Sequence, residues 1–248
     1  MIKMKNEEFT MPDLSAYDES EIINPRNEWL KKRRGYFTAS EFYKLMTVMG
    51  SPDKLPTGAI TYVNTKVAES LTEFVPDDGF TTAAMQWGIE TELQAIDSYI
   101  EKTGNAVMCT GDNQQFIEYT HYTTLTGHVG GTPDGIIYNA RAKKIGGIEI
   151  KCPNSDTHLT NLINIKCASD LADRYPNYYW QCQGLMMITG LESWQFVSFD
   201  PRYKVEKHRL HIVQIDRNPK KLLELQRRLV LAVELKNSIL AKLNERTP

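Results

Sequence analysis

Three residues near the middle of the chain have the types and the spacing that metal-assisted hydrolysis requires. Asp134 stands at a predicted turn, and Glu149 and Lys151 follow after a short basic stretch, two positions apart in an apolar run. Because residues i and i+2 of a strand point to the same face, Glu149 and Lys151 should project together. Ile148 and Ile150 should then pack on the opposite face. Two carboxylates that share a divalent ion beside an ammonium group suit the attack of water on a phosphodiester, so the pattern predicts a nuclease.

Two further polar residues are predicted to lie on apolar helix faces. The segment 82–103 predicts a helix, and Glu92 lies on the face formed by its apolar residues. These apolar residues are Met85, Ile89, Leu93, Ile96 and Ile100. Burial of an unpaired acidic group is costly, so Glu92 should have a partner. A second helix, predicted within 177–189, likewise places Gln181 on an apolar face.

These side chains together predict a magnesium site. Mg²⁺ prefers oxygen ligands in octahedral geometry and keeps several of its waters, so an incomplete protein shell is sufficient. Lys151 would orient the attacking water or offset charge on the phosphate oxygens, and Gln181 would hold that water or the neighbouring phosphate. We expect Mg²⁺ as the cofactor, with Mn²⁺ as an alternative ion. The predicted ligands are Asp134, Glu149, the backbone carbonyl of Ile150, and Glu92 either directly or through water.

The composition is that of a soluble globular protein. The chain has 248 residues, 41% hydrophobic and 24% charged, with a formal charge of −2. This charge argues against a strongly basic nucleic-acid coat but does not exclude a DNA enzyme, because basic residues cluster locally at Lys31–Arg34 and Lys143–Lys144. The four cysteines lack a close pair and are expected to be reduced thiols rather than metal ligands.

The pattern of the chain predicts a single α/β domain, 1–248, behind a polar N-terminal arm at about 1–24. No apolar run approaches the ~20 residues of a membrane helix, and the first residues lack the apolar core of a signal peptide, so we expect a cytoplasmic protein. Thr38 and Glu41 form a potential capping box for a helix. The mixture of elements predicts a mixed central sheet flanked by helices. Strands are predicted at 107–109, 116–119, 127–130, 135–138, 145–151, 194–199 and 208–215, and further helices at 59–70 and 219–244.

The chemistry-bearing residues also carry a family resemblance. Pro133-Asp134 with Glu149-x-Lys151 matches the pattern of the PD-(D/E)xK nuclease superfamily, whose restriction-endonuclease-like core has a mixed sheet flanked by helices. More specifically, the chain resembles the lambda-type phage exonucleases of recombination systems from about Trp29 to Ile215. The matching blocks, in order, are Trp29 to Glu41, Trp87 to Glu92, Thr132 to Gly135, Glu149 to Pro153, Tyr178 to Gln183 and Asp200 to Arg202.

The resemblance implies an activity and partners. Such enzymes use magnesium to digest one strand of linear duplex DNA from the 5′ end, leaving 3′ single-stranded tails for recombination by strand annealing. Members of the family generally assemble as rings of three subunits and work with a single-strand annealing protein in a bacterial host. The annealing partner and the trimer are expectations from the family alone.

The resemblance also implies roles for individual residues. By motif position, Glu92, Asp134, Glu149 and Lys151 take catalytic roles and Gln181 matches the family's glutamine. The terminal 5′ phosphate would be bound by Arg33, Ser40 and Thr132, the last standing where a serine is usual. A guanidinium fork can bind phosphate bidentately, and Ser40 would lie in the first turn of the predicted capped helix, where free N–H groups attract anions.

Two other functions remain open from the sequence. A PD-(D/E)xK endonuclease of the restriction or junction-resolving type would use the same chemistry but would cut covalently closed DNA. A DNA-end-binding module with an inactive nuclease is less compatible with the intact set of carboxylates beside Lys151.

Overall fold

The structure, a computed structural model, describes residues 25–46, 54–75, 82–108, 110–111 and 114–245. The predicted N-terminal arm at about 1–24 lies outside the described residues. Within the described ranges, no helix has both the length and the apolar character needed to cross a membrane.

A five-stranded mixed sheet forms the centre of the fold. Its strand order is β2 (Ala106–Met108), β5 (Gly135–Tyr138), β6 (Lys144–Lys151), β7 (Ser193–Phe199) and β8 (Leu210–Asp216). Only β6 and β7 pair in parallel, and the other neighbours are antiparallel. The predicted mixed sheet flanked by helices is therefore confirmed.

A second, smaller sheet joins the N-terminal part of the chain to the segment before β5. It has the order β1 (Phe37–Thr38), β4 (Val129–Gly131) and β3 (Ile117–Glu118), with β1 parallel and β3 antiparallel to β4. In the β1–β4 pair, Thr38 lies opposite Gly130. Because the two strands run in the same direction, the residues that follow them leave the sheet on the same side.

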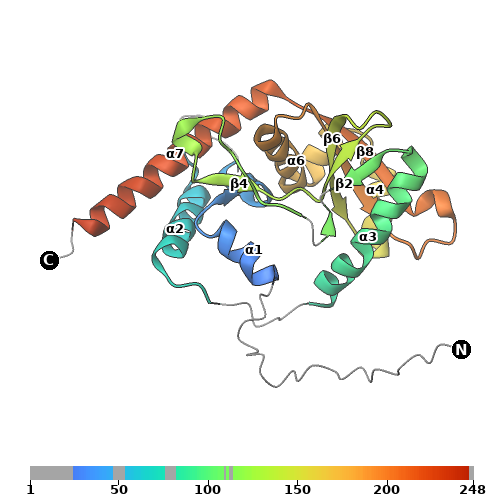
Figure 1. The fold of residues 1–248 in the computed structure, drawn as a ribbon, viewed down its shortest axis with the longest axis horizontal. Coiled ribbons are helices and arrows are strands. Elements are labelled where there is room, and N and C mark those ends of the chain that lie inside the picture. The colour runs from blue at the N-terminus through green and yellow to red at the C-terminus, as the bar shows by residue number, and fades with distance from the viewer. Residues whose placement is uncertain (1–24, 47–53, 76–81, 109, 112–113, 246–248) are drawn as a thin grey trace, which may run out of the picture.

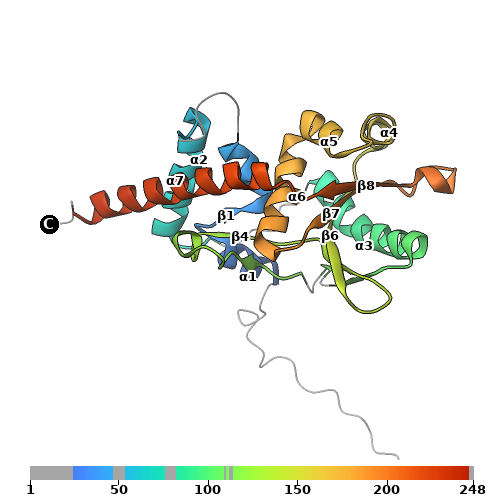
Figure 2. The ribbon, with the colours of Figure 1, turned by 90° about the horizontal axis from the view of Figure 1, so that it is seen from above.

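Helices cover both faces of the central sheet. As Figure 2 shows, α4 (Ser155–Asn164), α5 (Ala168–Arg174) and α6 (Pro176–Thr189) lie on one face, and α3 (Ala83–Thr103) lies on the other. Each face has its own apolar cluster, because successive side chains of a strand alternate between faces. On β7, for example, Trp194 and Phe196 belong to the larger cluster, whereas Val197 and Phe199 pack with α3.

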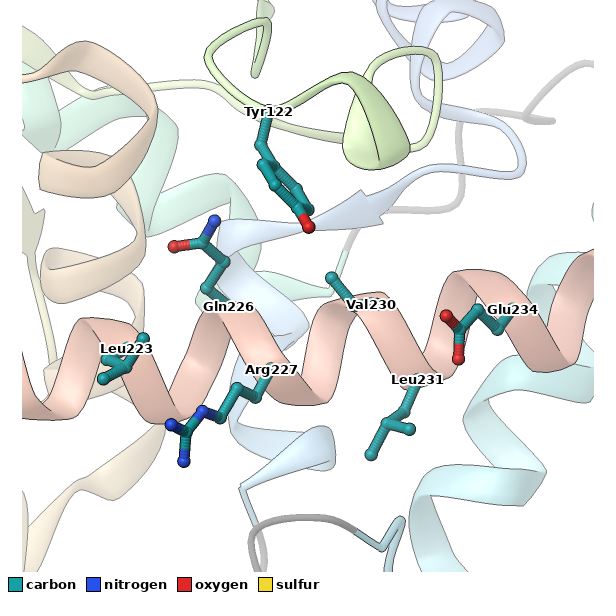
Figure 3. A pocket seen from close by; sticks show the side chains of 7 residues that line it. All are labelled: Tyr122, Leu223, Gln226, Arg227, Val230, Leu231 and Glu234. Carbon is teal, nitrogen blue, oxygen red and sulfur yellow. The ribbon is translucent and has the colours of Figure 1, made fainter.

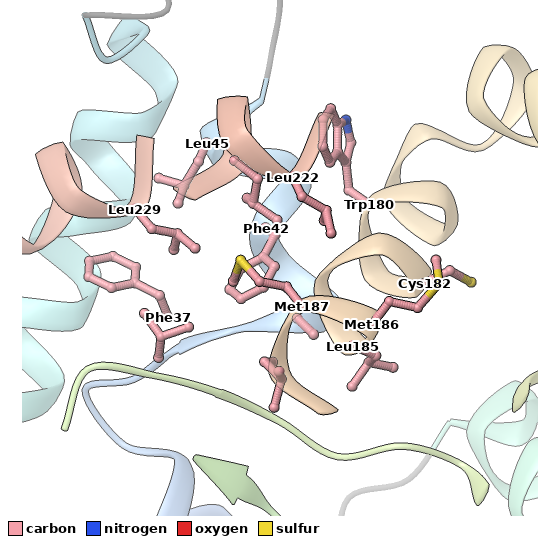
Figure 4. Packing of buried hydrophobic residues seen from close by; sticks show 14 of the residues in the cluster. Phe37, Phe42, Leu45, Trp180, Cys182, Leu185, Met186, Met187, Leu222 and Leu229 are labelled. Carbon is pink, nitrogen blue, oxygen red and sulfur yellow. The ribbon is translucent and has the colours of Figure 1, made fainter. Parts of the chain in front are cut away.

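The larger cluster is centred on α6, which is buried nearly all round. It packs against the 3₁₀ helix η3 (Ala39–Leu45), as Figure 4 shows for Phe42 beside Met187. A Cβ at Gly184 would lie 2.4 Å from the ring of Phe42, so this position needs a glycine for the two helices to approach. The sequence therefore brings η3 directly onto the helix that carries Gln181.

The remaining helices enclose this cluster from the side of the N-terminus. They are α1 (Pro25–Arg33), α2 (Thr57–Leu71), α7 (Pro219–Asn244) and the short 3₁₀ helix η5 (Thr123–Leu125). Another short 3₁₀ helix, η6 (Glu206–His208), lies in the connection between β7 and β8 and has no buried residue. The side chain of Asn218 caps α7 by accepting a hydrogen bond from the Lys221 amide. The C-terminal part of α7 extends beyond the rest of the fold (Figure 1).

The helices differ from the predictions in two respects, the number of short helices and the buried face of α3. The helices α1, α4 and α5 were not predicted, because their short segments lack a clear apolar period. The predicted apolar stripe of α3 is only partly right: Ile96 is buried as predicted, but Ile89 and Leu93 are more than half exposed. Thr91, Ala95 and Tyr99 are buried instead. The side chain of Met85, which belonged to this stripe, lies outside the described set.

The predicted capping box is also wrong. The helix after Thr38 is a seven-residue 3₁₀ helix, and the Thr38 side chain accepts no hydrogen bond from its backbone. The Thr38 hydroxyl instead lies 3.5 Å from Glu41, whose carboxylate binds Lys44 and Lys66. Glu41 is thus engaged by side chains rather than by the Thr38 backbone amide, and Ser40 does not lie in the first turn of a capped α-helix.

Candidate active site

The candidate site lies at the end of β6 that extends past the first residue of β5. Gly135, the first residue of β5, pairs with Ile148, so the last residues of β6 extend beyond the antiparallel ladder. Asp134, which directly precedes β5, lies beside these last residues of β6, and its Oδ2 accepts a hydrogen bond of 2.7 Å from the Ile150 amide. The N–H and C=O of one strand residue point to the same edge of the strand, so the Ile150 carbonyl also lies on the side of Asp134.

Glu149 and Lys151 project together from β6, as their spacing predicts. Their side chains form an ion pair and a hydrogen bond, and Ile148 and Ile150 belong to the apolar cluster on the opposite face. Glu149 is fully buried, and its Oε2 atom has no hydrogen-bond partner in the described part of the chain. A buried carboxylate oxygen without a partner is costly, so this atom is available to a ligand.

Aromatic rings support the Lys151 side chain. Its ammonium lies 5.2 Å from the centre of the Tyr178 ring, which stacks in turn on Phe196 of β7 at 5.7 Å. A cation over an aromatic face is attracted by the ring quadrupole. The helix α6 thus contributes both Tyr178 and the half-buried Gln181 to the side of the sheet from which Glu149 and Lys151 project.

Glu92 reaches the site from α3, the helix on the opposite face of the sheet. It is partly buried, and its Oε1 accepts a hydrogen bond of 2.9 Å from the side chain of Gln114. The expected partner of Glu92 is therefore a glutamine. Gln114 was not predicted as a site residue, because only the return of its loop to α3 gives it this role.

Burial raises the pKa values of all three carboxylates, and repulsion from Asp134 adds to the rise at Glu92 and Glu149. Burial raises the pKa of Glu149 to about 8, and the charges of Asp134 and Glu92 contribute to the rise while Lys151 opposes it. Burial, followed by repulsion from Asp134, raises the pKa of Glu92 to about 7. Burial also raises the pKa of Asp134. Although burial lowers the pKa of Lys151, the charges of Glu149 and Asp134 raise it above its ordinary value.

This charge distribution fits a divalent cation. An opposite charge nearby favours ionised carboxylates and would relieve their mutual repulsion, and Glu149 Oε2 offers an unused ligand atom. Among the described residues, however, no group of three His, Cys, Asp or Glu side chains is arranged to hold a metal ion. Glu149 is instead paired with Lys151, and Glu92 with Gln114. The metal ligands therefore stay a prediction.

The three residues predicted to bind a 5′ phosphate lie together. Arg33, at the end of α1, donates from Nη2 to the hydroxyl of Ser40 at 3.1 Å. Trp29, one turn earlier on α1, has its ring 3.9 Å from the Arg33 guanidinium carbon and donates from Nε1 to the Thr132 hydroxyl at 3.2 Å. Burial lowers the pKa of Arg33, and Glu41 opposes this shift. Because arginine stays protonated in proteins, the pocket keeps a partly desolvated cation surrounded by hydroxyls.

Hydrogen bonds from α2 and α7 hold the turn after Arg33 in place. The Gly35 amide donates to Glu69 at 2.9 Å, and its carbonyl accepts from Lys236 at 2.6 Å. Gly35 has a φ of +72°, a conformation that favours glycine. Arg34 binds backbone carbonyls at the end of α2, including that of Thr72 at 2.6 Å. These contacts hold the end of α1, and hence Arg33, against the rest of the fold.

One pocket of about 120 Å³ connects the two groups of residues. Seven of the predicted site residues line it, whereas Glu92 is joined to it through Gln114 and Ile150 through Asp134. We call this cavity the site pocket. Its lining residues are Trp29, Arg33, Thr38, Ala39, Ser40, Gln114, Gly131, Thr132, Asp134, Glu149, Lys151 and Gln181.

A larger hollow of about 660 Å³ lies elsewhere, between Tyr122 and one side of α7 (Figure 3). Arg227 and Glu234 supply its charges, and it contains no second carboxylate. The site pocket, in contrast, contains Asp134 and the fully buried Glu149 beside Lys151, so it is the candidate active site. The remaining lining residues of the larger hollow are Leu223, Gln226, Val230 and Leu231.

The described cysteines form no disulfide with one another. Cys152, Cys167 and Cys182 are free thiols, and Cys109 lies outside the described residues. Burial and the nearby charge of Glu92 raise the pKa of Cys152 to about 12, which disfavours its thiolate.

Comparisons with known proteins agree with this arrangement. Residues 28–192 match the family model of the YqaJ-like viral recombinase domain. The fold is similar to the alkaline exonuclease LHK-Exo of Laribacter hongkongensis, with 26% identity, a TM-score of 0.70, and coverage of 88% of this chain and 96% of that one. LHK-Exo has also been solved in complex with dAMP, and that structure matches with a TM-score of 0.69.

A phage-related exonuclease of Haemophilus somnus 129PT shares the fold at 19% identity, with a TM-score of 0.61 and coverage of 84% of this chain and 96% of that one. The comparison with curated protein sequences found no match. The family match covers more than half of the chain and contains all the residues that line the site pocket. The chain therefore belongs to the family of the YqaJ-like viral recombinase domain, and its fold is that of the PD-(D/E)xK alkaline exonucleases.

Proposed function

We propose that this protein is a magnesium-dependent 5′→3′ exonuclease that digests one strand of linear double-stranded DNA and leaves 3′ single-stranded tails. The observation that carries the proposal is the site pocket, which joins a carboxylate–lysine group to a guanidinium surrounded by hydroxyls. The first group suits phosphodiester hydrolysis, and the second suits a terminal phosphate.

The relative position of the two groups explains the proposed polarity. A 5′ phosphate bound by Arg33, Ser40 and Thr132 would place the next phosphodiester of the same strand toward Asp134 and Glu149. Cleavage there releases a nucleotide that carries the 5′ phosphate and leaves a new 5′ phosphate on the shortened strand. The complex of LHK-Exo with dAMP, a nucleoside monophosphate, supports this product class.

The chemistry assigns separate roles to the remaining side chains. Asp134, Glu149, the Ile150 carbonyl and Glu92, directly or through water, would hold Mg²⁺. When bound, the ion would polarise the phosphodiester and make a bound water more acidic. Lys151 would orient the attacking water or offset charge on the phosphate oxygens, and Gln181 would hold the water or the neighbouring phosphate.

The proposal extends to the assembly and its setting. The family resemblance supports a ring, generally a trimer, that acts with a single-strand annealing protein in recombination. The proposed place of action is the cytoplasm of a bacterial host, where phage DNA ends are available. A ring would keep the enzyme on its substrate by topological linkage, which agrees with the modest net charge of −2.

The direct test is digestion of linear duplex DNA that carries a distinct label at each end of each strand. With Mg²⁺, loss of the 5′ labels as mononucleotides and retention of 3′ tails are expected. Asp134→Ala and Lys151→Ala should each reduce the rate by about a thousandfold or more, because metal ligands and charge-stabilising groups each contribute several kcal/mol to the transition state. Glu101→Gln, an exposed position on α3, provides the matched control and should keep the wild-type rate.

Two results would contradict the proposal. Release of the 3′ labels first would reverse the polarity. Sustained nicking of covalently closed circles at the rate of linear digestion would instead indicate an endonuclease with the same chemistry.

A further inference from the structure

Trp29 contacts two of the three residues that form the proposed phosphate end of the site pocket. Its ring lies against Arg33, its Nε1 donates to the Thr132 hydroxyl, and the two partners are separated by most of the first half of the chain. We propose that Trp29 is a positioning residue that sets the preference of the site pocket for phosphorylated 5′ ends, an inference that rests on the proposed function.

The first contact fixes the plane of the Arg33 guanidinium. Trp29 and Arg33 are four positions apart on α1, so their side chains meet on one helix face. At 3.9 Å from the ring centre, the guanidinium stacks on the indole. Because a long arginine side chain otherwise loses considerable rotamer entropy on binding an anion, a stacked guanidinium is already ordered before the anion arrives.

The second contact decides the direction of the Thr132 hydroxyl proton. A hydroxyl has one proton to donate and two lone pairs that accept, whereas an indole N–H can only donate. Since the Thr132 oxygen accepts from Trp29 at 3.2 Å, its own proton is left to donate elsewhere. Both residues line the site pocket, where a phosphate oxygen would accept that proton.

Arg33 orients the Ser40 hydroxyl in the way that Trp29 orients the Thr132 hydroxyl, by donating a hydrogen bond to its oxygen. The Ser40 oxygen accepts from Arg33 Nη2 at 3.1 Å, and it also lies 3.4 Å from the Thr38 hydroxyl. The guanidinium and the Thr132 hydroxyl are thus both arranged as donors, and Trp29 touches both. A site that presents donors alone favours an anionic phosphate over a neutral 5′ hydroxyl.

The inference distinguishes tryptophan from other aromatic residues. Phenylalanine would keep a ring against Arg33 but would leave the Thr132 hydroxyl free to rotate. Leucine would remove both contacts. The two variants therefore separate the stacking contribution from the hydrogen bond.

The experiment measures binding of duplex ends with 5′ phosphate or 5′ hydroxyl by fluorescence anisotropy in EDTA, and digestion of the same duplexes with Mg²⁺. The ratio of the two Kd values is the readout, because a general folding defect changes both affinities alike. Trp29→Phe should lower this preference for phosphate by about fivefold, as expected for loss of one hydrogen bond. Trp29→Leu should lower it by about 30-fold, because the cation–π contact is lost as well.

Two further variants make the test specific. Thr132→Val should lower the preference at least as much as Trp29→Phe, because it removes both the hydrogen bond to Trp29 and the hydroxyl that would donate to phosphate. Adding Trp29→Phe to Thr132→Val should then lower the preference no further, since the hydrogen bond that Trp29→Phe removes is already absent. Trp87→Phe is the matched control, because Trp87 stacks on Arg202 at 4.4 Å outside the site pocket. It should leave the ratio of Kd values unchanged.

The outcomes separate this inference from the proposed function. A protein that binds phosphorylated ends preferentially, loses this preference in Trp29→Phe, but digests no DNA would support the role of Trp29 and contradict the exonuclease. Equal Kd values for the two ends in the wild type, or an unchanged ratio in Trp29→Leu, would overturn the role of Trp29, whatever the rate of digestion.

Discussion

Glu149 and Lys151 form an ion pair from the same face of β6, with the glutamate fully buried and the lysine side chain 27% exposed. Lys151 does not satisfy both carboxylate oxygens of Glu149, because one of them has no hydrogen-bond partner among the described residues. Breaking a buried pair is costly, and the second carboxylate oxygen is costly to leave unsatisfied. This relationship makes the site sensitive to pH and to cations.

The stability of the metal-free protein should fall as the pH rises between about 4.5 and 8. The pKa of Glu149 is raised from 4.5 to about 8 in the folded state, chiefly by burial. Within this window the folded protein binds more protons than the unfolded chain, so increasing pH favours unfolding. Glu149→Gln should reduce this dependence and leave the contributions of Glu92 and Asp134, whose pKa values are also raised. Melting temperatures measured in EDTA from pH 5 to 9 test the prediction, and identical slopes for both proteins would refute it.

Removing Gln114 should weaken the response to magnesium. Its side chain holds Glu92 Oε1 at 2.9 Å, and residues that orient a metal ligand typically contribute about tenfold or more to affinity or activity. Gln114→Ala should therefore raise the Mg²⁺ concentration for half-maximal digestion by about tenfold. Gln86→Ala is the control, because Gln86 makes a similar 2.6 Å bond to the exposed Glu90 on the same helix. Equal magnesium titrations for both variants would show that the Glu92 contact is unimportant.

The ring of Tyr178 should matter more than its hydroxyl. Lys151 lies 5.2 Å from the ring centre, and cation–π contacts contribute about 0.5–2 kcal/mol depending on desolvation. Tyr178→Phe should retain nearly the wild-type rate of digestion, whereas Tyr178→Leu should lower kcat about tenfold through misplacement of Lys151. Rates under saturating DNA and Mg²⁺ measure the effect. A rate in Tyr178→Phe as low as in Tyr178→Leu would instead point to the hydroxyl.

The close approach of η3 to α6 predicts a stability effect at one glycine. A Cβ at Gly184 would lie 2.4 Å from Phe42, so Gly184→Ala should destabilise the fold by about 1–3 kcal/mol, the usual cost of overpacking. Gly58→Ala in α2 is the matched control, since no atom lies within 4 Å of its Cβ position. It should be neutral or stabilise the helix by about 0.5–1 kcal/mol. Urea unfolding of both variants measures the difference, and equal midpoints would argue against the tight contact.

Much of the fold was predictable because its signals are local. The turn at Asp134 and the alternation from Ile148 to Lys151 concern neighbouring residues, and strand geometry alone determines which side chains share a face. The long helices α2, α3, α6 and α7 likewise follow from periods and breaks within short windows. The capping box at Thr38 failed because the neighbouring Lys44 and the distant Lys66 both bind Glu41, and no short window contains Lys66.

The face that a helix buries depends on what it packs against. On α3 the apolar period predicted Ile89 and Leu93 as inward residues, yet the sheet covers Ala95 and Tyr99 instead. Apolar spacing identifies a helix but does not identify its partner, since many stripes on one helix are compatible with a period of 3.6 residues.

The sequence by itself determined the chemistry of this protein: a carboxylate and an ammonium two residues apart on a strand, preceded by an aspartate at a turn. Only the tertiary structure decided which distant groups complete the site. Gln114 reaches Glu92, and Trp29 joins Arg33 to Thr132, a residue 103 positions away. Local backbone geometry places neighbours in the chain, whereas packing of the whole fold places residues that are far apart in sequence, and that packing is set by contacts no short window contains.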